Sequence, residues 1–507
     1  MTRLEALVAG QAARTPDAIA VVDEDRRVTY GELDLAANRT ANALLAGGLR
    51  PDDRVCLLVP KSIEMLVYLL GVLKAGGVCV PLDTASPAAR LGTIVTQVRP
   101  CVLISDGKRA ELAAQLTDAV PAGTITRLLV PDDSGPAVPP KAEAGASGVA
   151  YLLFTSGSTG EPKGVQLTHE GIVHYVRWAN GHFGITADER ISCHLQMHFD
   201  GSLWDVYAAL LSGAQLHLVP KSASLTPGLL VEFLKDARIT QFLSVPSVLS
   251  AIARRDVLGE YELPDLRRVL WGGEVFPPED VSYWLRKVPH AAFLGVYGTT
   301  ETTIASTYHT VSKPPAEPLP VGVPIPGEWV SIVDEELRVL PAGEVGEVVI
   351  GGVGVTPGYW RSPERTARAF VELPPGSGQR AYRTGDLGRI GPDGVLRFQG
   401  RADRQVKISG YRVELDDLMA ALHSVPEVAA GAVVTAPGRG GGPEICAAYT
   451  VTGGAHLTTA ELRATLARRL PPYMVPTRWL VLDQLPVNSN GKTDLMAIRR
   501  QFAAEEG

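Results

Sequence analysis

Residues 151–164 read YLLFTSGSTGEPKG, an apolar run that changes abruptly into a loop of glycines, hydroxyl side chains and one lysine. The apolar run predicts a buried strand. Glycine lets backbone N–H groups converge on an anion, and Ser, Thr and Lys add donors. A Walker loop needs Gly-Lys-Ser/Thr after four intervening residues, whereas Pro162-Lys163-Gly164 stand at those positions after Gly157. The stretch predicts a phosphate-binding loop of another kind, with a flexible surface turn as the alternative.

Strand and helix patterns alternate before this loop. Residues 54–60, 78–82 and 101–105 are short apolar runs that predict strands, and residues 61–75 predict a helix. Strands interleaved with helices are typical of parallel sheets covered on both faces. We therefore expect an α/β fold with doubly wound sheets. Residues 131–147, rich in Pro, Gly, Ala and Asp, predict an exposed connector.

The chain length indicates more than one domain, because 507 residues exceed one ordinary core. The composition becomes more charged from Gly400 onward, where a helix over 414–423 and two strand-like runs follow. A compact piece of this size is typical of a separate domain. We expect a large domain over residues 1–402 and a small, mobile α+β domain over 403–507.

The bulk composition excludes several classes of function. The net charge is -7, from 48 basic and 55 acidic residues without a basic block, so neither nucleic acid nor an anionic membrane is an expected partner. The five scattered cysteines predict reduced core residues, and no Cys or His spacing suits a structural zinc site. The N-terminus lacks a signal-peptide core and no stretch could span a bilayer, so we expect a cytoplasmic protein.

Further motifs follow one another in a set order along the chain. Together with the loop they resemble the core motifs of the adenylate-forming superfamily, which includes acyl-CoA synthetases, luciferases and the adenylation domains of nonribosomal peptide synthetases. The sequences of these motifs are most similar to those of the peptide-synthetase branch. These motifs are VTYGEL at 28–33, FDGS at 199–202, YGTTE at 297–301, YRTGDL at 382–387, GRADRQVK at 400–407, LPPYMVP at 470–476 and NGKTD at 490–494.

Two residues depart from the family pattern. Gly295 stands where the family usually has Asn, and Thr299 replaces a Pro. The loss of a rigid residue at position 299 could loosen this turn. The residues with implied chemical roles, Thr300 and Glu301, are both present.

The resemblance implies ATP and Mg²⁺ as cofactors. Glu301 would ligate Mg²⁺, which makes pyrophosphate a better leaving group, and Thr300 would contact the α-phosphate. Asp386 is suited to the ribose, because a carboxylate has two acceptor oxygens. The implied phosphate ligands are Thr155, Ser156, Gly157, Ser158, Thr159, Gly160 and Lys163, and the other implied nucleotide contacts are Gly273, Glu274, Tyr297 and Arg401.

Lys492 is the residue implied to stabilise the reacting carboxylate and phosphate, and a solvated lysine in an Asn-Gly turn is the alternative. If it lies on the small domain, the active site assembles by domain closure. The family is understood to rotate this domain between an adenylate-forming and a thiol-accepting pose. Asp403 falls at the hinge, with a surface carboxylate as the alternative, and residues 409–412 would line the thiol tunnel.

Asp200 distinguishes amino acids from other acids. It aligns with the family's partner for the substrate α-ammonium, and a buried carboxylate needs such a counterion. Asp205 is nearby, but its spacing does not fit. The implied pocket is apolar apart from Asp200 and Lys492 at its ends, which favours an apolar, leucine-like substrate, with an aromatic one next. The other implied lining residues are Gly201, Trp204, Leu243, Leu270, Gly272, Val296, Ile304 and Ala305.

Two other functions compete with amino-acid activation. An acyl-CoA synthetase is disfavoured by Asp200, and a non-catalytic nucleotide-binding homologue should have lost Lys492, Asp386 or Glu301. No carrier or condensation motif is present, so we expect a free-standing adenylation enzyme or one cut from a larger synthetase. The expected partners are an amino acid and a separate phosphopantetheinylated carrier protein, with a small activating protein as a further candidate.

Overall fold

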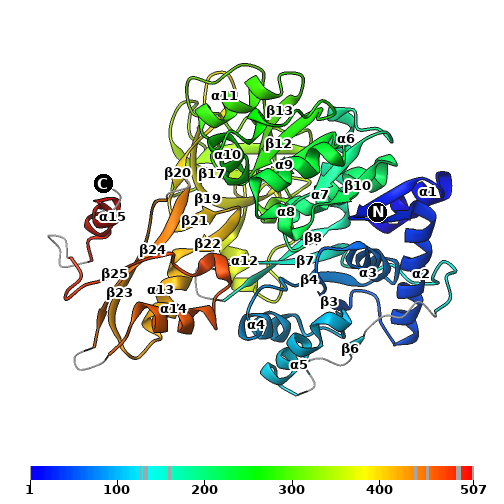
Figure 1. The fold of residues 1–507 in the computed structure, drawn as a ribbon, viewed down its shortest axis with the longest axis horizontal. Coiled ribbons are helices and arrows are strands. Elements are labelled where there is room, and N and C mark those ends of the chain that lie inside the picture. Colours follow the sequence, from blue (N-terminus) through cyan, green and yellow to red (C-terminus); the bar gives the residue numbers. More distant parts are fainter. Residues whose placement is uncertain are drawn as a thin grey trace.

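The computed structural model describes residues 2–122, 124, 128–129, 135–157, 161–438, 442–452, 456–486 and 493–504 (Figure 1). A six-stranded sheet has the order β6-β5-β3-β4-β7-β8, parallel except for the last pair. Ser62 accepts a hydrogen bond from the Met65 N–H, which starts the predicted helix at Ile63. The elements are β3 (Arg54–Leu58), α3 (Ile63–Lys74), β4 (Val78–Pro81), α4 (Ala88–Val98), β5 (Val102–Ser105), α5 (Ala110–Ala119), β6 (Leu128–Leu129), β7 (Val149–Thr155) and β8 (Lys163–Thr168).

A second sheet of nine strands has the order β15-β14-β13-β12-β11-β9-β10-β1-β2, with parallel pairing from β13 to β1. Its strands are β1 (Ile19–Asp23), β2 (Arg26–Thr29), β9 (Arg190–Cys193), β10 (Gln215–Leu218), β11 (Gln241–Ser244), β12 (Arg268–Gly272), β13 (Ala292–Tyr297), β14 (Thr307–Val311) and β15 (Val323–Pro324). The accompanying helices are α1 (Leu4–Arg14), α2 (Tyr30–Ala46), α6 (His169–Phe183), α7 (Asp200–Ser212), α8 (Lys221–Ser224), α9 (Pro227–Asp236), α10 (Pro246–Arg254) and α11 (Pro278–Lys287).

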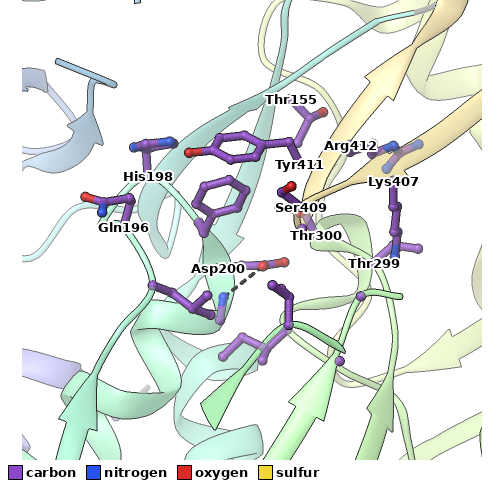
Figure 2. Close-up of a pocket in the computed structure, with 18 of the residues that line it drawn as sticks. Thr155, Gln196, His198, Asp200, Thr299, Thr300, Lys407, Ser409, Tyr411 and Arg412 are labelled. Carbon is purple, nitrogen blue, oxygen red and sulfur yellow. Dashed lines mark hydrogen bonds between the residues drawn. The ribbon is translucent and has the colours of Figure 1, made fainter. Parts of the chain in front are cut away.

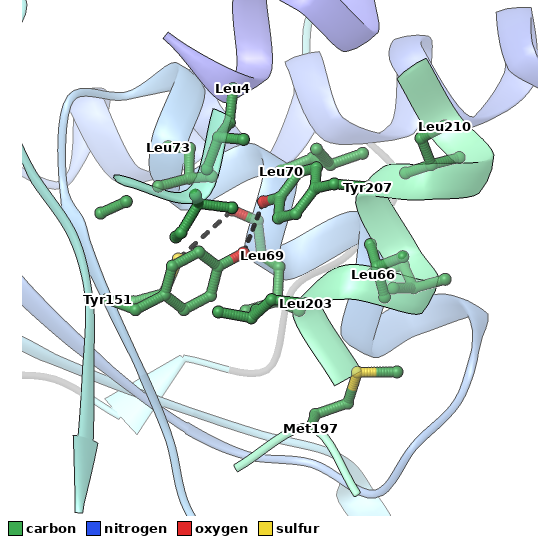
Figure 3. Close-up of a cluster of buried hydrophobic side chains, with 14 of the residues drawn as sticks. Leu4, Leu66, Leu69, Leu70, Leu73, Tyr151, Met197, Leu203, Tyr207 and Leu210 are labelled. Carbon is green, nitrogen blue, oxygen red and sulfur yellow. Dashed lines mark hydrogen bonds between the residues drawn. The ribbon is translucent and has the colours of Figure 1, made fainter. Parts of the chain in front are cut away.

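One hydrophobic core joins the two sheets. Helices α3 and α7 meet between them, and Leu69 and Leu203 lie in the same buried cluster (Figure 3). The hydroxyls of Tyr151 and Tyr207 lie 2.5 Å apart inside this cluster, so each of these two buried hydroxyls has a partner. This shared core fixes the strand ends of one sheet relative to those of the other.

A smaller antiparallel sheet adjoins these two, and its order is β16-β17-β19-β18 with β20 paired to β19. Its elements are β16 (Glu328–Val333), β17 (Gly346–Gly352), α12 (Pro363–Ala369), β18 (Phe370–Glu372), β19 (Arg380–Ile390) and β20 (Leu396–Arg401).

The C-terminal part has two core clusters, whose residues all lie between Val406 and Phe502. Its three-stranded sheet packs α13 and α14 against one face and α15 against the other, as a separate domain would (Figure 1). The boundary between residues 402 and 403 stays a prediction. The elements are β21 (Gln405–Ile408), β22 (Tyr411–Glu414), α13 (Leu415–His423), β23 (Val428–Pro437), β24 (Pro443–Val451), α14 (Thr459–Ala467), β25 (Arg478–Val481) and α15 (Leu495–Ala504).

No helix among the described residues combines the length and apolarity needed to cross a membrane.

Glu328 should make stability depend on pH. Its Oε1 accepts a hydrogen bond from the Gly354 N–H at 2.6 Å, and burial raises its pKa to about 7 despite that bond. The folded protein therefore keeps a proton that the unfolded chain releases nearer pH 4.5, so stability falls as pH rises between these values. Glu328→Gln should match the wild type near pH 5 and be more stable by about 2 kcal/mol at pH 8.

Urea unfolding at both pH values measures this difference. Glu344→Gln, at an exposed position, is the control and should change nothing. A stabilisation by Glu328→Gln that is equal at pH 5 and pH 8 would contradict the account.

Candidate active site

A cavity of about 350 Å³ lies between the large domain and the β21-β22 hairpin of the C-terminal part (Figure 2). Most of its large-domain residues lie near or after the carboxyl ends of β7, β9, β11, β12 and β13, the edge at which doubly wound sheets bind ligands. The predicted site residues that line it are Thr155, Ser156, Asp200, Gly201, Trp204, Leu243, Gly272, Gly273, Val296, Thr300, Ile304, Asp386 and Arg401. Ser158, Thr159, Gly160 and Lys492 lie outside the described residues.

The predicted phosphate loop begins where β7 ends. A Cβ at Gly157 would lie 2.3 Å from the Glu161 carbonyl oxygen, so only glycine fits this approach. The Thr155 Oγ1 is buried and has no hydrogen-bond partner in the described part of the chain. Lys163 lies opposite Thr155 in the β7-β8 register. An anionic ligand would satisfy this unpaired buried hydroxyl.

Glu301 is fully buried at the centre of a charged cluster. Its carboxylate accepts hydrogen bonds from Arg412 Nη1 at 2.9 and 3.1 Å and from the Tyr359 hydroxyl at 2.8 Å. Lys163 Nζ lies 3.3 Å from the same carboxylate. Burial alone would raise the pKa of Glu301, but Arg412 and Lys163 outweigh it and hold that pKa well below its ordinary value. The carboxylate is thus ionised and already paired.

Asp200 opens helix α7 and lines the cavity (Figure 2). Its Oδ1 accepts a hydrogen bond from the Gly201 N–H at 2.8 Å. Burial raises the pKa of Asp200, while hydrogen bonds from Thr300 and Gly201 and the charge of Lys407 oppose that rise. Asp205 differs, because both its oxygens are buried without partners in the described residues and it does not line the cavity.

Asp386 is held from two sides. The Tyr297 hydroxyl donates to its Oδ2 at 2.7 Å, and Arg401 Nη1 contacts its Oδ1. Tyr297 itself packs in a core of β16, β17 and β20 side chains and does not line the cavity. Arg401 also donates to the Asp403 carboxylate at 2.7 and 2.8 Å. In this pose Arg401 therefore links Asp403, the predicted hinge residue, to Asp386, the predicted ribose ligand.

The apolar end of the cavity differs in part from the predicted lining. Leu270 lies two residues before the end of β12, so it contributes to the core beneath the cavity. Ala305 packs under Gly298, where an added Cβ would lie 2.5 Å from the Ala305 Cα. Leu195 lines the cavity instead and fills the space beside Gly201, since a Cβ there would lie 2.6 Å from Leu195 Cδ1. The glycine at 201 therefore does not deepen the pocket.

Glu274 does not line the cavity and contacts the C-terminal part instead. Its carboxylate accepts from the Ser247 N–H at 2.9 Å and from the Gly410 N–H at 2.6 Å. Its predicted contact with the base remains a prediction.

The C-terminal hairpin brings further residues to the cavity. Lys407, Tyr411 and Arg412 line it, and the Tyr411 ring lies between those of Phe199 and Tyr473 at 4.8 and 3.7 Å. Lys407 received no role from the sequence. The alternation of the strand could have indicated it. Val406 and Ile408 pack on the C-terminal core, so Lys407 between them points to the other face of the strand. Residues 409–412 line the cavity, and their predicted place along a thiol tunnel stays a prediction.

These features together define an adenylate-forming enzyme. Residues 8–360 match the AMP-binding enzyme family, and residues 420–492 match the AMP-binding enzyme C-terminal domain. The chain belongs to the AMP-binding enzyme family. The predicted fold class and the resemblance to the adenylate-forming superfamily are therefore confirmed.

Among its relatives, tyrocidine synthase 2 of Brevibacillus parabrevis is 35% identical over 499 residues, or 98% of this chain. The chain spans only 14% of that protein and 44% of tyrocidine synthase 1 from the same organism. The amide bond synthetase McbA from Marinactinospora thermotolerans superposes with a TM-score of 0.90 at 26% identity, over 99% of this chain and 100% of that one. PA1221, an NRPS protein with adenylation and PCP domains, superposes with a TM-score of 0.84 at 27% identity. The superposition covers 98% of this chain and 84% of that one.

Proposed function

We propose that this protein uses ATP to convert an apolar amino acid into its aminoacyl-adenylate and then transfers the aminoacyl group to the phosphopantetheine thiol of a separate carrier protein. The observation that carries the proposal is Asp200, a half-buried carboxylate that lines the cavity together with Leu195, Trp204, Val296 and Ile304. An α-ammonium group would satisfy it, whereas a fatty or aryl acid would leave it without a counterion.

The phosphate end of the cavity supports the first step. A carboxylate that attacks the α-phosphate of ATP meets another anion, so cations and oriented donors must offset the repulsion. The loop beginning at Thr155 and the Lys163 ammonium would hold the phosphates, with Lys492 at the reacting atoms. Glu301 fits Mg²⁺, which commonly takes one or two carboxylates and completes its shell with phosphates and water. Bound there, the ion would neutralise charge on the departing pyrophosphate.

The pocket shape supports a leucine-like substrate, with an aromatic one next. Trp204 lies beside the Tyr175 and Phe183 rings at 5.4 and 5.8 Å and forms the floor. Leu195, Val296 and Ile304 line the pocket around it. The side chains of Leu195, Val296 and Ile304 offer no hydrogen-bond partner, so a polar substrate side chain placed against them would lose hydrogen bonds on binding.

Ile304 tests the pocket. Its φ is +72°, a strained value for a β-branched residue. Ile304→Gly should relieve this strain and widen the pocket, so the ratio of exchange with phenylalanine to exchange with leucine should rise roughly tenfold. Leu337→Gly relieves a φ of +61° away from the cavity and should leave the ratio unchanged. An unchanged ratio in Ile304→Gly would contradict the role of Ile304 in selecting the substrate side chain.

The acceptor is the second part of the proposal. Similarity to PA1221, which combines adenylation and PCP domains, supports a carrier thiol. An amine acceptor is a second candidate, favoured by the superposition on an amide bond synthetase over the whole of both chains. The need for a small activating protein and the cytoplasmic location remain predictions.

Trapping the adenylate tests both steps. Enzyme, ATP, Mg²⁺ and leucine with hydroxylamine should give leucine hydroxamate, and replacing hydroxylamine by a holo carrier protein should add one leucyl group to the carrier's mass. Hydroxamate without carrier loading, but with amide formation from a free amine, would favour the second candidate. No hydroxamate with any amino acid would contradict the proposed activity.

A further inference from the structure

Lys61 joins the two large sheets of the protein. It stands in the connection between β3 and α3, and its ammonium donates to the backbone carbonyls of Cys193 and His194 at 2.8 and 2.9 Å. Strand β3 belongs to the six-stranded sheet, whereas Cys193 ends β9 of the nine-stranded sheet. A hydrogen bond from a cation is stronger than one between neutral groups. This side chain therefore ties the end of β9 to the other sheet.

The backbone on both sides of Lys61 is well anchored. Strand β3 lies between β4 and β5 in its sheet, and its last residue, Leu58, is fully buried. On the other side, Ser62 caps α3 by accepting a hydrogen bond from the Met65 N–H. Burial lowers the pKa of Lys61 below its ordinary value, so solvent competes poorly for its ammonium. Lys61 thus holds the two carbonyls from a fixed base.

The two carbonyls stand at the start of a segment that lines the cavity. Residues 194–199 connect β9 to α7, and the cavity is lined by residues of this segment, among them Gln196 and His198 (Figure 2). The segment leads directly into Asp200, the first residue of α7. The places of these side chains therefore depend on how the start of the segment is held.

Removing the ammonium would take a donor from both carbonyls. The Cys193 carbonyl would keep its hydrogen bond from the Val219 N–H at 3.2 Å. The His194 carbonyl lies one peptide further along, next to Leu195, whose Cδ1 fills the space beside Gly201. A carbonyl of a buried residue that loses its donor turns toward water or another donor. Such a turn would move Leu195 and change the wall of the pocket.

We propose that Lys61 is a positioning residue for the amino-acid pocket, which sets the places of Leu195 and Asp200 by holding the two carbonyls at the start of their segment. This inference rests on the proposed function, because it concerns the binding of the amino acid. The predicted nucleotide ligands come from other elements, Thr155 from β7 and Asp386 from β19. Losing the ammonium should therefore weaken the amino acid much more than ATP.

Lys61→Met removes the ammonium and keeps a side chain of similar length. In amino-acid-dependent pyrophosphate exchange its half-saturating leucine concentration should rise roughly tenfold, because the pocket wall is displaced. Its half-saturating ATP concentration should stay within about twofold of the wild type. Lys61→Arg, which keeps a cation with donors, should recover part of the affinity for leucine. Lys61→Gln should act in the same direction as Lys61→Met and serves as the second variant if Lys61→Met does not fold.

Lys74→Met is the matched control. Lys74 ends the same helix and donates to Asp34 and Asn38 at 2.7 and 2.8 Å, and its side chain is 7% exposed. This variant also strips partners of a buried ammonium, but none of the three residues lines the cavity. It should leave both half-saturating concentrations unchanged. Thermal unfolding of each variant shows that it is folded.

Amide hydrogen exchange tests the positioning without any substrate. Mass spectrometry of fragments from the free, full-length chain reports exchange over residues 194–202. This stretch includes the Phe199 N–H, which donates to the Gln196 carbonyl at 2.9 Å. Exchange there should be roughly tenfold faster in Lys61→Met than in the wild type and unchanged in Lys74→Met.

Two results would overturn the inference: unchanged hydrogen exchange over residues 194–202 in a folded Lys61→Met, or half-saturating leucine and ATP concentrations that rise by the same factor. A failure of the proposed function looks different. In that case the wild type would show no amino-acid-dependent pyrophosphate exchange, while hydrogen exchange over the segment would still respond to Lys61→Met.

Discussion

Asp200→Asn should lower amino-acid-dependent pyrophosphate exchange by roughly 100- to 1,000-fold in kcat/KM, because the substrate ammonium would be buried without its counterion. The carboxylate lines the cavity and burial raises its pKa, so solvent compensates poorly for a charge lost there. Exchange measured at several leucine concentrations gives this value.

Asp205→Asn is the matched control. Asp205 lies on the same helix and is also buried, but burial raises its pKa well above the ordinary value and it does not line the cavity. An amide replaces a protonated carboxyl with little change, so this variant should keep near wild-type exchange. Equal losses in the two variants would show that the effect is structural and would remove Asp200 as the ammonium partner.

Lys492→Ala is expected to have the second large effect. Under the proposed function, Lys492 stabilises the transition state at the reacting carboxylate and α-phosphate, so exchange should fall roughly 100- to 1,000-fold. Transfer from chemically prepared leucyl-adenylate to a holo carrier should stay within about threefold of wild type, because the reaction no longer involves ATP. Single-turnover measurements of the two steps separate them.

Lys407 gives the contrasting variant. It lines the cavity from the C-terminal hairpin in the pose described here. Lys407→Ala should therefore weaken transfer more than exchange. If Lys492→Ala slowed both steps equally, the assignment of this lysine to adenylation alone would be wrong.

The sequence predicted the fold well where patterns are local. The strands beginning at Arg54 and Val78 and the helix between them have the expected bounds within two residues. Their signals were strong because parallel strands are apolar on both faces. Gly157 makes a close backbone approach just after β7, and the contact of this loop with phosphate stays a prediction.

The parts of the site that depend on the domain contact could not be predicted. The pairing of Arg412 with Glu301 joins residues 111 positions apart, and it depends on the pose of the C-terminal part. No spacing in the chain indicates it. Leu195 was missed for a similar reason, because its contact with Gly201 depends on how the segment between β9 and α7 folds back over the cavity.

Amino-acid-dependent exchange of labelled pyrophosphate into ATP tests the central claim most directly. It is run with the twenty common amino acids, with fatty acids and with aryl acids, and Lys492→Ala is the control. The proposed function predicts a signal confined to leucine or a few other apolar amino acids and lost in the variant. Exchange only with acids that lack an amino group would contradict the role of Asp200 and indicate an acyl-CoA synthetase, and the absence of exchange with every acid would contradict the proposed activity.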